Sequence, residues 1–205
     1  MKTRQEISLD HWLITQMIKE GSKVLDLGCG DGELLKNLIK TKHCNGHGIE
    51  ISEHLVYICI EKGLNVIHGD IDTGLSEYQT GSFDYVILNQ SLQQVLHFER
   101  VFEEALRVGR YAIIGIPNFA YWPARFQVFF LGKTPATVTL PYLWYESPNI
   151  RWLSIADFVS FCDRKKTRII RAIFINNKRI IRIFPNFFAS SAIFLLTKFG
   201  PRSNL

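Results

Sequence analysis

Three glycines at alternate positions, Gly28, Gly30 and Gly32, follow a short apolar run that begins at Val24. From Glu33 onward, apolar residues recur at helical spacing, so the segment is typical of a strand, a tight loop and a helix start. Glycine tolerates the backbone angles of such a loop and lets a ligand lie against bare backbone. The free N–H groups of the helix start would point at that ligand. The pattern therefore predicts a cofactor site of the nucleotide type.

Polar side chains stand at the ends of three further predicted strands. Glu50 closes the second strand, Asp70 closes the third, and Asn89 follows the fourth. In a parallel sheet, ligands bind at the carboxyl ends of the strands. We therefore expect these residues to meet the glycine loop at one sheet edge. Glu50 would hold a ribose diol there, and Asp70 with Ile71 would line an adenine.

The residues around the loop distinguish between two classes of cofactor. A nicotinamide site would read GxGxxG, whereas here Glu33 stands where the third glycine would fall. Asp26 and Asp31 lie close to the helix start and would repel a pyrophosphate. They would not repel S-adenosylmethionine, which carries a sulfonium and an ammonium group and no phosphate. The sequence therefore favours S-adenosylmethionine or S-adenosylhomocysteine.

Alternating helices and strands along the first 118 residues would position this site. Apolar periodicity predicts helices at 7–20, 33–42, 52–62 and 98–108, and strands at 24–27, 46–51, 65–70, 83–88 and 111–116. Such alternation is typical of a parallel sheet with helices on both faces. A helix at 154–162, with Ser154 and Asp157 as its capping box, would follow. Two antiparallel strands at 168–176 and 189–198 would complete the sheet, which makes seven strands.

Residues 119–152 interrupt this alternation. The segment is rich in aromatic side chains and is broken by prolines. A loop of this length in a compact domain is often a lid or a binding segment. Its Tyr and Trp residues could line a pocket for an acceptor, cover the sheet as core, or form an interface. The sequence leaves these alternatives open, and we expect one domain, 1–205, that carries this lid.

Size and cysteine usage narrow the class of protein. The 205 residues, of which 47% are hydrophobic, suffice for one domain with a sizeable core. No apolar run reaches the roughly 20 residues of a membrane span, and the charged N-terminus shows no secretory signal. The four cysteines form no CxxC pair, which is typical of reduced thiols. We therefore expect a cytoplasmic protein.

The net charge of +5 hides an asymmetry, because residues 1–110 carry −5 and residues 111–205 carry +10. The basic half could meet nucleic acid, an anionic substrate or an acidic protein, or it could be a solvated face. No recognised nucleic-acid motif accompanies it, so we do not expect a nucleic-acid partner. We also expect no metal site, because the side chains of His43, Cys44 and His47 would diverge where a strand begins.

The motifs together resemble one known family. The segment VLDLGCGDG with the strand-end acids Glu50 and Asp70 resembles class I S-adenosylmethionine-dependent methyltransferases. Further blocks are similar to the family of the methionine-biosynthesis protein MetW. They are GIEI, NVIHGDIDTGLSEYQTGSFDYVILNQSLQQV and RVGRYAIIGIPNFAYWPARFQVFFLGKTPATVTLPYLWYESPNI. The resemblance extends over about residues 8–198.

This resemblance implies a Rossmann-like α/β fold of the class I methyltransferases and a role beside homoserine O-acyltransferase in methionine biosynthesis. It also implies cofactor contacts from ten residues: Asp26, Gly28, Cys29, Gly30, Gly32, Glu50, Ile51, Asp70, Ile71 and Asn89.

A catalytic residue is not evident in the sequence. The fourth strand continues into Asn89-Gln90-Ser91-Leu92 and not into the Asn-Pro-Pro-Tyr type of amino-methylating enzymes, and His97 is a lone histidine at a helix start. Two main hypotheses remain: an accessory or regulatory protein, and an active methyltransferase acting on a small molecule. A methyltransferase acting on RNA through the basic half is a third.

Overall fold

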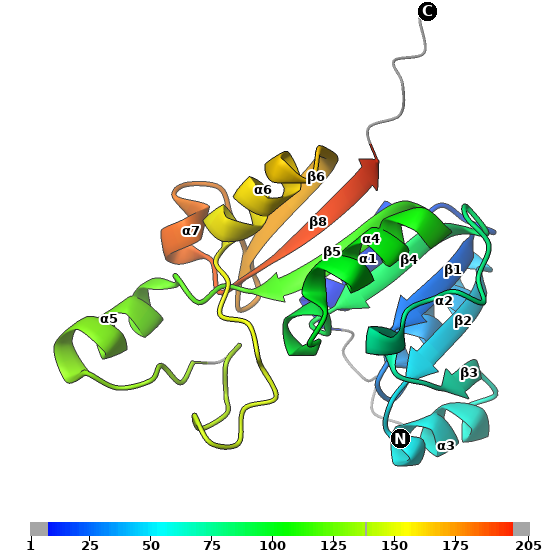
Figure 1. Cartoon of the computed structure of the whole chain (residues 1–205), viewed down its shortest axis with the longest axis horizontal. Coiled ribbons are helices and arrows are strands. Elements are labelled where there is room, and N and C mark those ends of the chain that lie inside the picture. The colour runs from blue at the N-terminus through cyan, green and yellow to red at the C-terminus, as the bar shows by residue number, and fades with distance from the viewer. Residues whose placement is uncertain (1–7, 138, 199–205) are drawn as a thin grey trace, which may run out of the picture.

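One mixed sheet organises the computed structural model, which describes residues 8–137 and 139–198. Within these residues the sheet has eight strands in the order β3-β2-β1-β4-β5-β8-β6-β7 (Figure 1). Their bounds are β1 Lys23–Leu27, β2 Asn45–Glu50, β3 Asn65–His68, β4 Phe83–Asn89, β5 Gly109–Pro117, β6 Thr167–Asn176, β7 Arg179–Ile181 and β8 Ser191–Lys198.

The strands β1 to β5 pair in parallel, and β8 inserts between β5 and β6 antiparallel to both. The predicted parallel sheet and its antiparallel last strand are therefore confirmed. The predicted number of seven strands is wrong by one, because β7 forms an additional edge strand paired with the end of β6. The third strand is also shorter than predicted, since β3 ends at His68.

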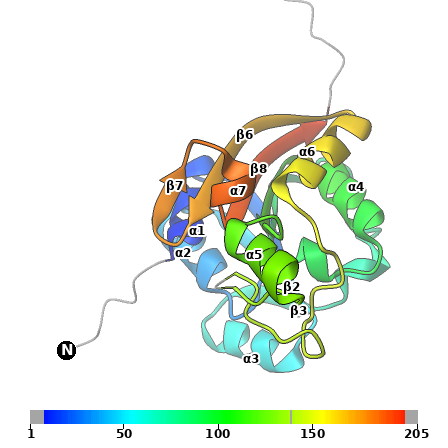
Figure 2. The same cartoon turned by 90° about the vertical axis from the view of Figure 1, so that its left-hand side faces the viewer.

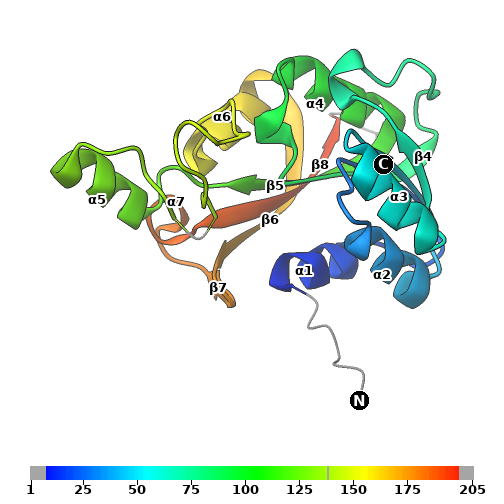
Figure 3. The ribbon, with the colours of Figure 1, turned by 90° about the horizontal axis from the view of Figure 1, so that it is seen from below.

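Helices cover both faces of the sheet, as Figure 3 shows from below. Their bounds are α1 Leu9–Met17, α2 Glu33–Lys42, α3 Glu53–Glu61, α4 Phe98–Val108, α5 Trp122–Leu131, α6 Ile155–Arg164 and α7 Pro185–Phe188, with 3₁₀ turns η1 Ile71–Thr73 and η2 Leu92–Gln94.

The two faces have separate apolar cores. The side chains of α4 and α6 pack over one face, where Phe158 lies against both Phe102 and Phe194 of β8. The side chains of α1 and α2 pack over the other, where Ile14 and Leu38 lie in one buried cluster with strand residues. Each of these four helices thus buries an apolar stripe against the sheet.

The predicted capping box at the start of α6 is present. The Ser154 hydroxyl accepts a hydrogen bond from the backbone N–H of Asp157 at 3.1 Å, and the Asp157 carboxylate accepts one from the backbone N–H of Ser154 at 3.0 Å. The two residues satisfy N–H groups that a helix start otherwise leaves open. The end of the preceding segment is therefore fixed in position.

A single buried asparagine joins the end of β5 to α6 and α7. The Asn118 amide nitrogen donates to the backbone oxygens of Asn186 and Ala189 at 3.1 and 2.7 Å. Its amide oxygen accepts from the backbone N–H groups of Ala120 and Ile155 at 3.1 and 3.4 Å. Both ends of residues 119–152, called here the aromatic segment, are therefore held at one point.

No helix within the described part of the chain is long and apolar enough to cross a membrane. Ile7, where the first predicted helix begins, and the N-terminal residues on which the expectation of no secretory signal depends lie outside the described residues.

Candidate functional site

The glycine loop lies against the end of β2. The backbone N–H groups of Gly28 and Cys29 both donate to the backbone oxygen of Ile49, at 2.8 and 3.2 Å. Gly28 has a φ of +74°, and a Cβ there would lie 2.8 Å from the Cβ of Ser91. Glycine is therefore needed at this position both for the backbone angle and for the close approach of the segment after β4.

Glu50 fixes the loop from the end of β2. One carboxylate oxygen accepts from the backbone N–H of Gly30 and the other from the backbone N–H of Ser52, each at 2.9 Å. The carboxylate is buried and ionic hydrogen bonds of this kind are stronger than neutral ones. A negative charge therefore lies directly beside the backbone of the glycine loop.

These ends of strands surround a cavity of about 430 Å³. Its walls come from the ends of β1 and β2, from the residues after β3 and β4, and from the aromatic segment. The lining residues are Gly28, Gly30, Ile49, Glu50, Ile51, Leu55, Gly69, Ile71, Gln90, Ser91, Gln94, Val95 and Pro148. We call it the glycine cavity.

Five of the ten predicted site residues line the glycine cavity: Gly28, Gly30, Glu50, Ile51 and Ile71. The Ile51 side chain is 63% exposed, although it is large and apolar. A flat apolar group such as a purine base could cover it. The strand ends that the sequence predicted to converge do so here.

Three of the other predicted residues, Gly32, Cys29 and Asp26, pack within the structure beside the cavity. Gly32 precedes α2 with a φ of +76°, and a Cβ there would strike Leu64 and Cys59. Cys29 belongs to the same small apolar cluster, and burial, with Asp26 nearby, raises the pKa of its thiol. A neutral buried thiol is a packing group.

Asp26 is the penultimate residue of β1, and it is only 2% exposed. Burial, and then the neighbouring carboxylate of Glu50, raise its pKa to about 7. The two acids therefore share one site in which only one of them carries a full charge at neutral pH. A cation nearby would favour the ionised form of Asp26.

The side chains of Asp70 and Asn89 have hydrogen-bond partners outside the glycine cavity. The Asp70 carboxylate accepts from the backbone N–H of Asp72 at 2.8 Å and caps η1. The Asn89 amide nitrogen donates to the carboxylate of Asp10 at 3.0 Å, towards α1. Both residues follow or end strands as predicted, but their side chains line other parts of the molecule.

Lys62 changes the electrostatic argument for the loop. Its ammonium lies 3.1 Å from a carboxylate oxygen of Asp31 and 2.7 Å from one of Glu33. We expected Asp31 to repel a pyrophosphate, but this ion pair offsets much of its charge. Repulsion of a phosphate cofactor would therefore come from Glu50 and Asp26.

A second cavity of about 480 Å³ adjoins the first, because Gln90 and Gln94 line both. Its wall includes Asp10 of α1 and Gln93 of η2. Burial alone would raise the pKa of Asp10, but hydrogen bonds from Ser8 and Asn89 lower it below its ordinary value. The second cavity therefore carries an ionised carboxylate in its wall.

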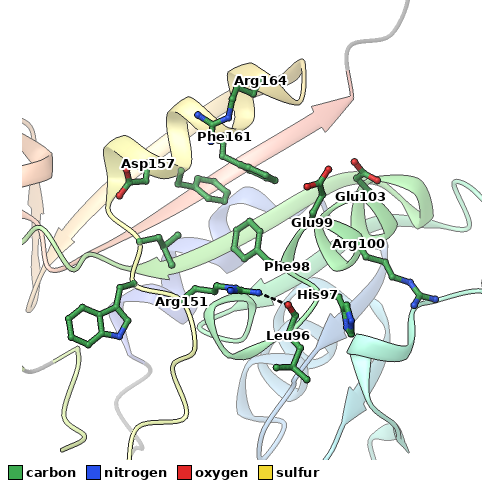
Figure 4. A pocket seen from close by; sticks show the side chains of 13 residues that line it. Leu96, His97, Phe98, Glu99, Arg100, Glu103, Arg151, Asp157, Phe161 and Arg164 are labelled. Carbon is green, nitrogen blue, oxygen red and sulfur yellow. Dashed lines mark hydrogen bonds between the residues drawn. The ribbon is translucent and has the colours of Figure 1, made fainter. Parts of the chain in front are cut away.

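Another cleft, of about 710 Å³, lies between α4, α6 and the end of the aromatic segment (Figure 4). His97 lines this cleft, and its ring nitrogen lies 3.3 Å from the carboxylate of Asp72. Arg151 crosses it and donates to the backbone oxygen of Leu96 at 2.6 Å. None of its described lining residues belongs to the glycine cavity, so His97 does not face that cavity.

The aromatic residues of the segment have different environments. Tyr142 lines the second cavity, and the Tyr121 hydroxyl lies 3.2 Å from the amide oxygen of Asn176. The side chains of Trp122, Trp144 and Tyr145 are exposed. Of the three alternatives, a place in the core therefore fails for most of them, and both an acceptor wall and an interface remain.

Several lining residues were not predicted. Gln94, Val95 and Leu55 line the cavity, but no motif in the sequence marks them as site residues. Pro148 lines it too, although it lies far from the glycine loop along the chain. Gln90 differs from these, because the sequence already placed it with Asn89 beside the methionyl end of the cofactor; it lines the cavity with a φ of +60°, an uncommon angle for a residue other than glycine. That angle is visible only in the structure.

The sequence profile of the family described as "Methionine biosynthesis protein MetW" matches residues 8–196. The chain belongs to the MetW family. A bifunctional methionine biosynthesis protein MetXA/MetW of Rhodopirellula baltica is 38% identical over 161 residues, which are 74% of this chain and 26% of that protein. This MetW-family chain thus spans about a quarter of the length of that relative.

Methyltransferases are also similar to this MetW-family chain in sequence and in structure. A phthiotriol/phenolphthiotriol dimycocerosates methyltransferase of Mycobacterium tuberculosis is 29% identical over 112 residues, 52% of this chain and 41% of that protein. A SAM-dependent methyltransferase structure from Thermotoga maritima superposes with a TM-score of 0.67 at 18% identity, covering 93% of this chain and 88% of that one. The predicted Rossmann-like methyltransferase fold is therefore confirmed.

Proposed function

We propose that this MetW-family protein binds S-adenosylmethionine or S-adenosylhomocysteine in the glycine cavity and acts with homoserine O-acyltransferase in methionine biosynthesis. The observation that carries the proposal is the shape and charge of that cavity. It combines the bare backbone of Gly28 and Gly30, the carboxylate of Glu50 and the exposed side chain of Ile51. These are the three kinds of surface that a nucleoside with a cationic tail needs.

The residues present fit this ligand. A Cβ added to Gly30 would meet nothing within 4 Å, so there is open space over the loop. The ribose hydroxyls would donate to Glu50, and the base would lie on Ile51 and Ile71. Asp26 does not line the cavity but lies buried beside it, and because its pKa is raised, a cation in the cavity would favour its ionised form.

The partner is supported by the relative from Rhodopirellula baltica, a bifunctional protein that joins MetXA and MetW in one chain. Two activities fused in one protein commonly act in one process. The resemblance to the MetW family leads us to assign homoserine O-acyltransferase as the activity with which this chain associates.

A regulatory mechanism is favoured by the lining of the glycine cavity. Glu50 is its one ionisable side chain among the described residues, and both of its oxygens accept backbone N–H groups. The cavity thus offers no free base for a methyl acceptor. Ligand binding in the cavity, and not transfer of the methyl group, would then regulate the acyltransferase.

The cavity is connected to the aromatic segment through η2. Pro148 lines the cavity directly. Close by along the chain, the backbone N–H groups of Ile150 and Arg151 both donate to the backbone oxygen of Gln93 at 3.0 Å, and the next residue, Gln94, lines the cavity again. A ligand that contacts Pro148 and Gln94 therefore fixes the aromatic segment on the sheet.

Calorimetry with the purified protein tests the first half of the proposal. We expect saturable binding of both nucleosides, and no binding of either at millimolar concentration would contradict it. The second half is tested by mixing the protein with homoserine O-acyltransferase in the presence and absence of S-adenosylmethionine. We expect a complex or a changed acyl-transfer rate, and the absence of both would remove the partner.

A second candidate function, methyl transfer to a small polar molecule, is favoured by the second cavity. It shares Gln90 and Gln94 with the glycine cavity and is lined by polar groups, among them the ionised Asp10. An acceptor there would lie next to the cofactor. Transfer of labelled methyl groups to a metabolite extract, lost on Gln93→Leu while nucleoside binding persists, would support this candidate over the regulatory one.

A further inference from the structure

The helix α5 exposes most of its apolar side chains. Of its ten residues, only Ala124 is buried. Phe129 and Phe130 are 81% and 66% exposed. Figure 1 shows α5 standing away from the sheet at one end of the molecule. The large apolar residues exposed on it are Trp122, Phe126, Val128, Phe129, Phe130 and Leu131, which we call the α5 face.

The α5 face continues onto α7. The guanidinium of Arg125 lies 5.5 Å from the ring centre of Phe187, so the two helices are in contact (Figure 2). Phe184, Phe187 and Phe188 are exposed as well. Apolar patches of this extent on a protein surface are usually sites of interaction. Neither the glycine cavity nor the second cavity is lined by α5, so the patch is not a wall of either.

The segments that form this surface carry only positive charges. In the sequence, no Asp or Glu occurs between residues 119 and 145 or after residue 163. Arg125 lies within α5 and Lys133 follows it, whereas Arg179 of β7 and Arg182 precede α7 in the chain. Neither Arg179 nor Arg182 has an ion-pair partner among the residues that the structure describes.

This charge pattern indicates which kind of molecule binds the surface of α5 and α7. A second copy of the chain would bring these cations against one another, which costs free energy across an interface. A partner with acidic groups around an apolar hollow would complement both parts of the surface. The Rhodopirellula baltica relative, in which MetXA and MetW share one chain, favours a protein as that partner.

We propose that the α5 face and α7 form the docking surface for homoserine O-acyltransferase, which would present an apolar hollow rimmed by Asp and Glu. The inference rests on the proposed function for the identity of the partner. In such a complex the aromatic side chains are the anchors and the arginines orient the encounter. The glycine cavity stays open, because α5 lies outside it, and the aromatic segment connects the two.

The double variant Phe129→Glu/Phe130→Glu tests the surface without removing a buried side chain. Its matched control is Tyr57→Glu on α3, a helix that Figure 1 shows at the other end of the molecule. The Tyr57 side chain is 66% exposed, as that of Phe130 is. We expect the double variant to bind the acyltransferase at least about 30-fold more weakly, as for an interface hot spot. The control should bind as the unsubstituted protein does, and both should bind S-adenosylhomocysteine normally.

A second variant, Arg179→Glu/Arg182→Glu, tests the acidic chemistry of the partner. Association should slow at least about tenfold at low salt, and the salt dependence of the unsubstituted complex should be largely lost. An unchanged association rate and salt dependence would overturn the acidic rim.

Other outcomes overturn the proposal in distinguishable ways. If the unsubstituted complex forms and both double variants bind equally well, the docking surface is wrong and the proposed function stands. If no complex forms at all, the partner fails together with the surface. A concentration-dependent dimer, or binding to vesicles of anionic phospholipid, that is lost in Phe129→Glu/Phe130→Glu would assign the surface to a second copy or to a membrane instead.

Discussion

The carboxylate of Glu50 accepts a hydrogen bond from the backbone N–H of Gly30 at 2.9 Å, across twenty residues of sequence. This contact joins the acid at the end of β2 to the loop that follows β1. It brings a full negative charge to the backbone surface over which the ligand would lie. Charge and loop shape therefore depend on the same side chain.

Replacing Glu50 with glutamine should weaken both the fold and ligand binding. The amide can accept from Gly30 or from Ser52, but its NH₂ group must then face the other backbone N–H. We expect a loss of about 1 to 3 kcal/mol in the free energy of unfolding and at least about tenfold weaker binding of S-adenosylhomocysteine. Urea titration and calorimetry measure the two. Glu53→Gln, at an exposed position of α3, is the control and should change neither quantity. Equal nucleoside affinity of the unsubstituted protein and both variants would contradict the role assigned to Glu50.

Replacing Gly30 with alanine should separate binding from stability. Gly30 and Gly81 have φ values of +58° and +68°, and a Cβ at either would meet nothing within 4 Å. Each alanine should therefore cost about 1 to 2 kcal/mol for its left-handed backbone alone. Only Gly30 lines the cavity, so only Gly30→Ala should lower nucleoside affinity, by about tenfold or more in calorimetry. A matching loss in Gly81→Ala would show that the effect is global.

The buried Asp26 should make stability depend on pH. Burial and Glu50 raise its pKa from 3.8 to about 7 in the folded protein, so the fold binds a proton that the unfolded chain releases. The free energy of unfolding should therefore fall, through this group, as the pH rises from about 4 to about 7, by at most about 4 kcal/mol.

Asp26→Asn should remove this dependence and become more stable than the unsubstituted protein at pH 8. Urea titrations at several pH values give the difference, which should grow up to about pH 7 and then stay level. Asp163→Asn, at an exposed position of α6, serves as the control. Parallel curves for Asp26→Asn and the unsubstituted protein would refute the shifted pKa.

Asn118→Ala should loosen the aromatic segment. The change removes an amide that satisfies two backbone oxygens and two backbone N–H groups in a buried position. We expect a loss of about 3 kcal/mol or more in unfolding free energy. Hydrogen exchange should speed up in residues 119–152 before the rest. Asn45→Ala, at an exposed position of β2, should leave exchange unchanged, and a uniform increase across the chain would speak against a local joint.

The order of helices and strands could be predicted because each buries one regular face. The predicted helix 98–108 agrees with α4, and the predicted strand 83–88 lies within β4. The strand β7 was missed because three residues carry no periodicity of their own. Arg179–Ile181 become a strand only by pairing with Phe174–Asn176.

The site could be predicted as a set of strand ends but not as a set of side-chain directions. Glycines and Glu50 were found because their chemistry is unusual at those positions. Asn89 turned towards Asp10 of α1, and Asp70 capped the turn that follows it. Those partners come from other elements or from local turn geometry. The exposure of α5 was also hidden, since aromatic composition is the same in a core, a pocket wall and an interface.

The position of β8 bears on how the chain folds as it leaves the ribosome. The strands β1 to β5, with the glycine loop, can pair as soon as they are made. β6 and β7 cannot join them, because Ser191–Lys198 must first fill the place between β5 and β6. Until then the long edge of β5 is open to pairing with other chains. A growing chain would therefore form its ligand loop well before its sheet is complete, and chaperones would bind it in that state.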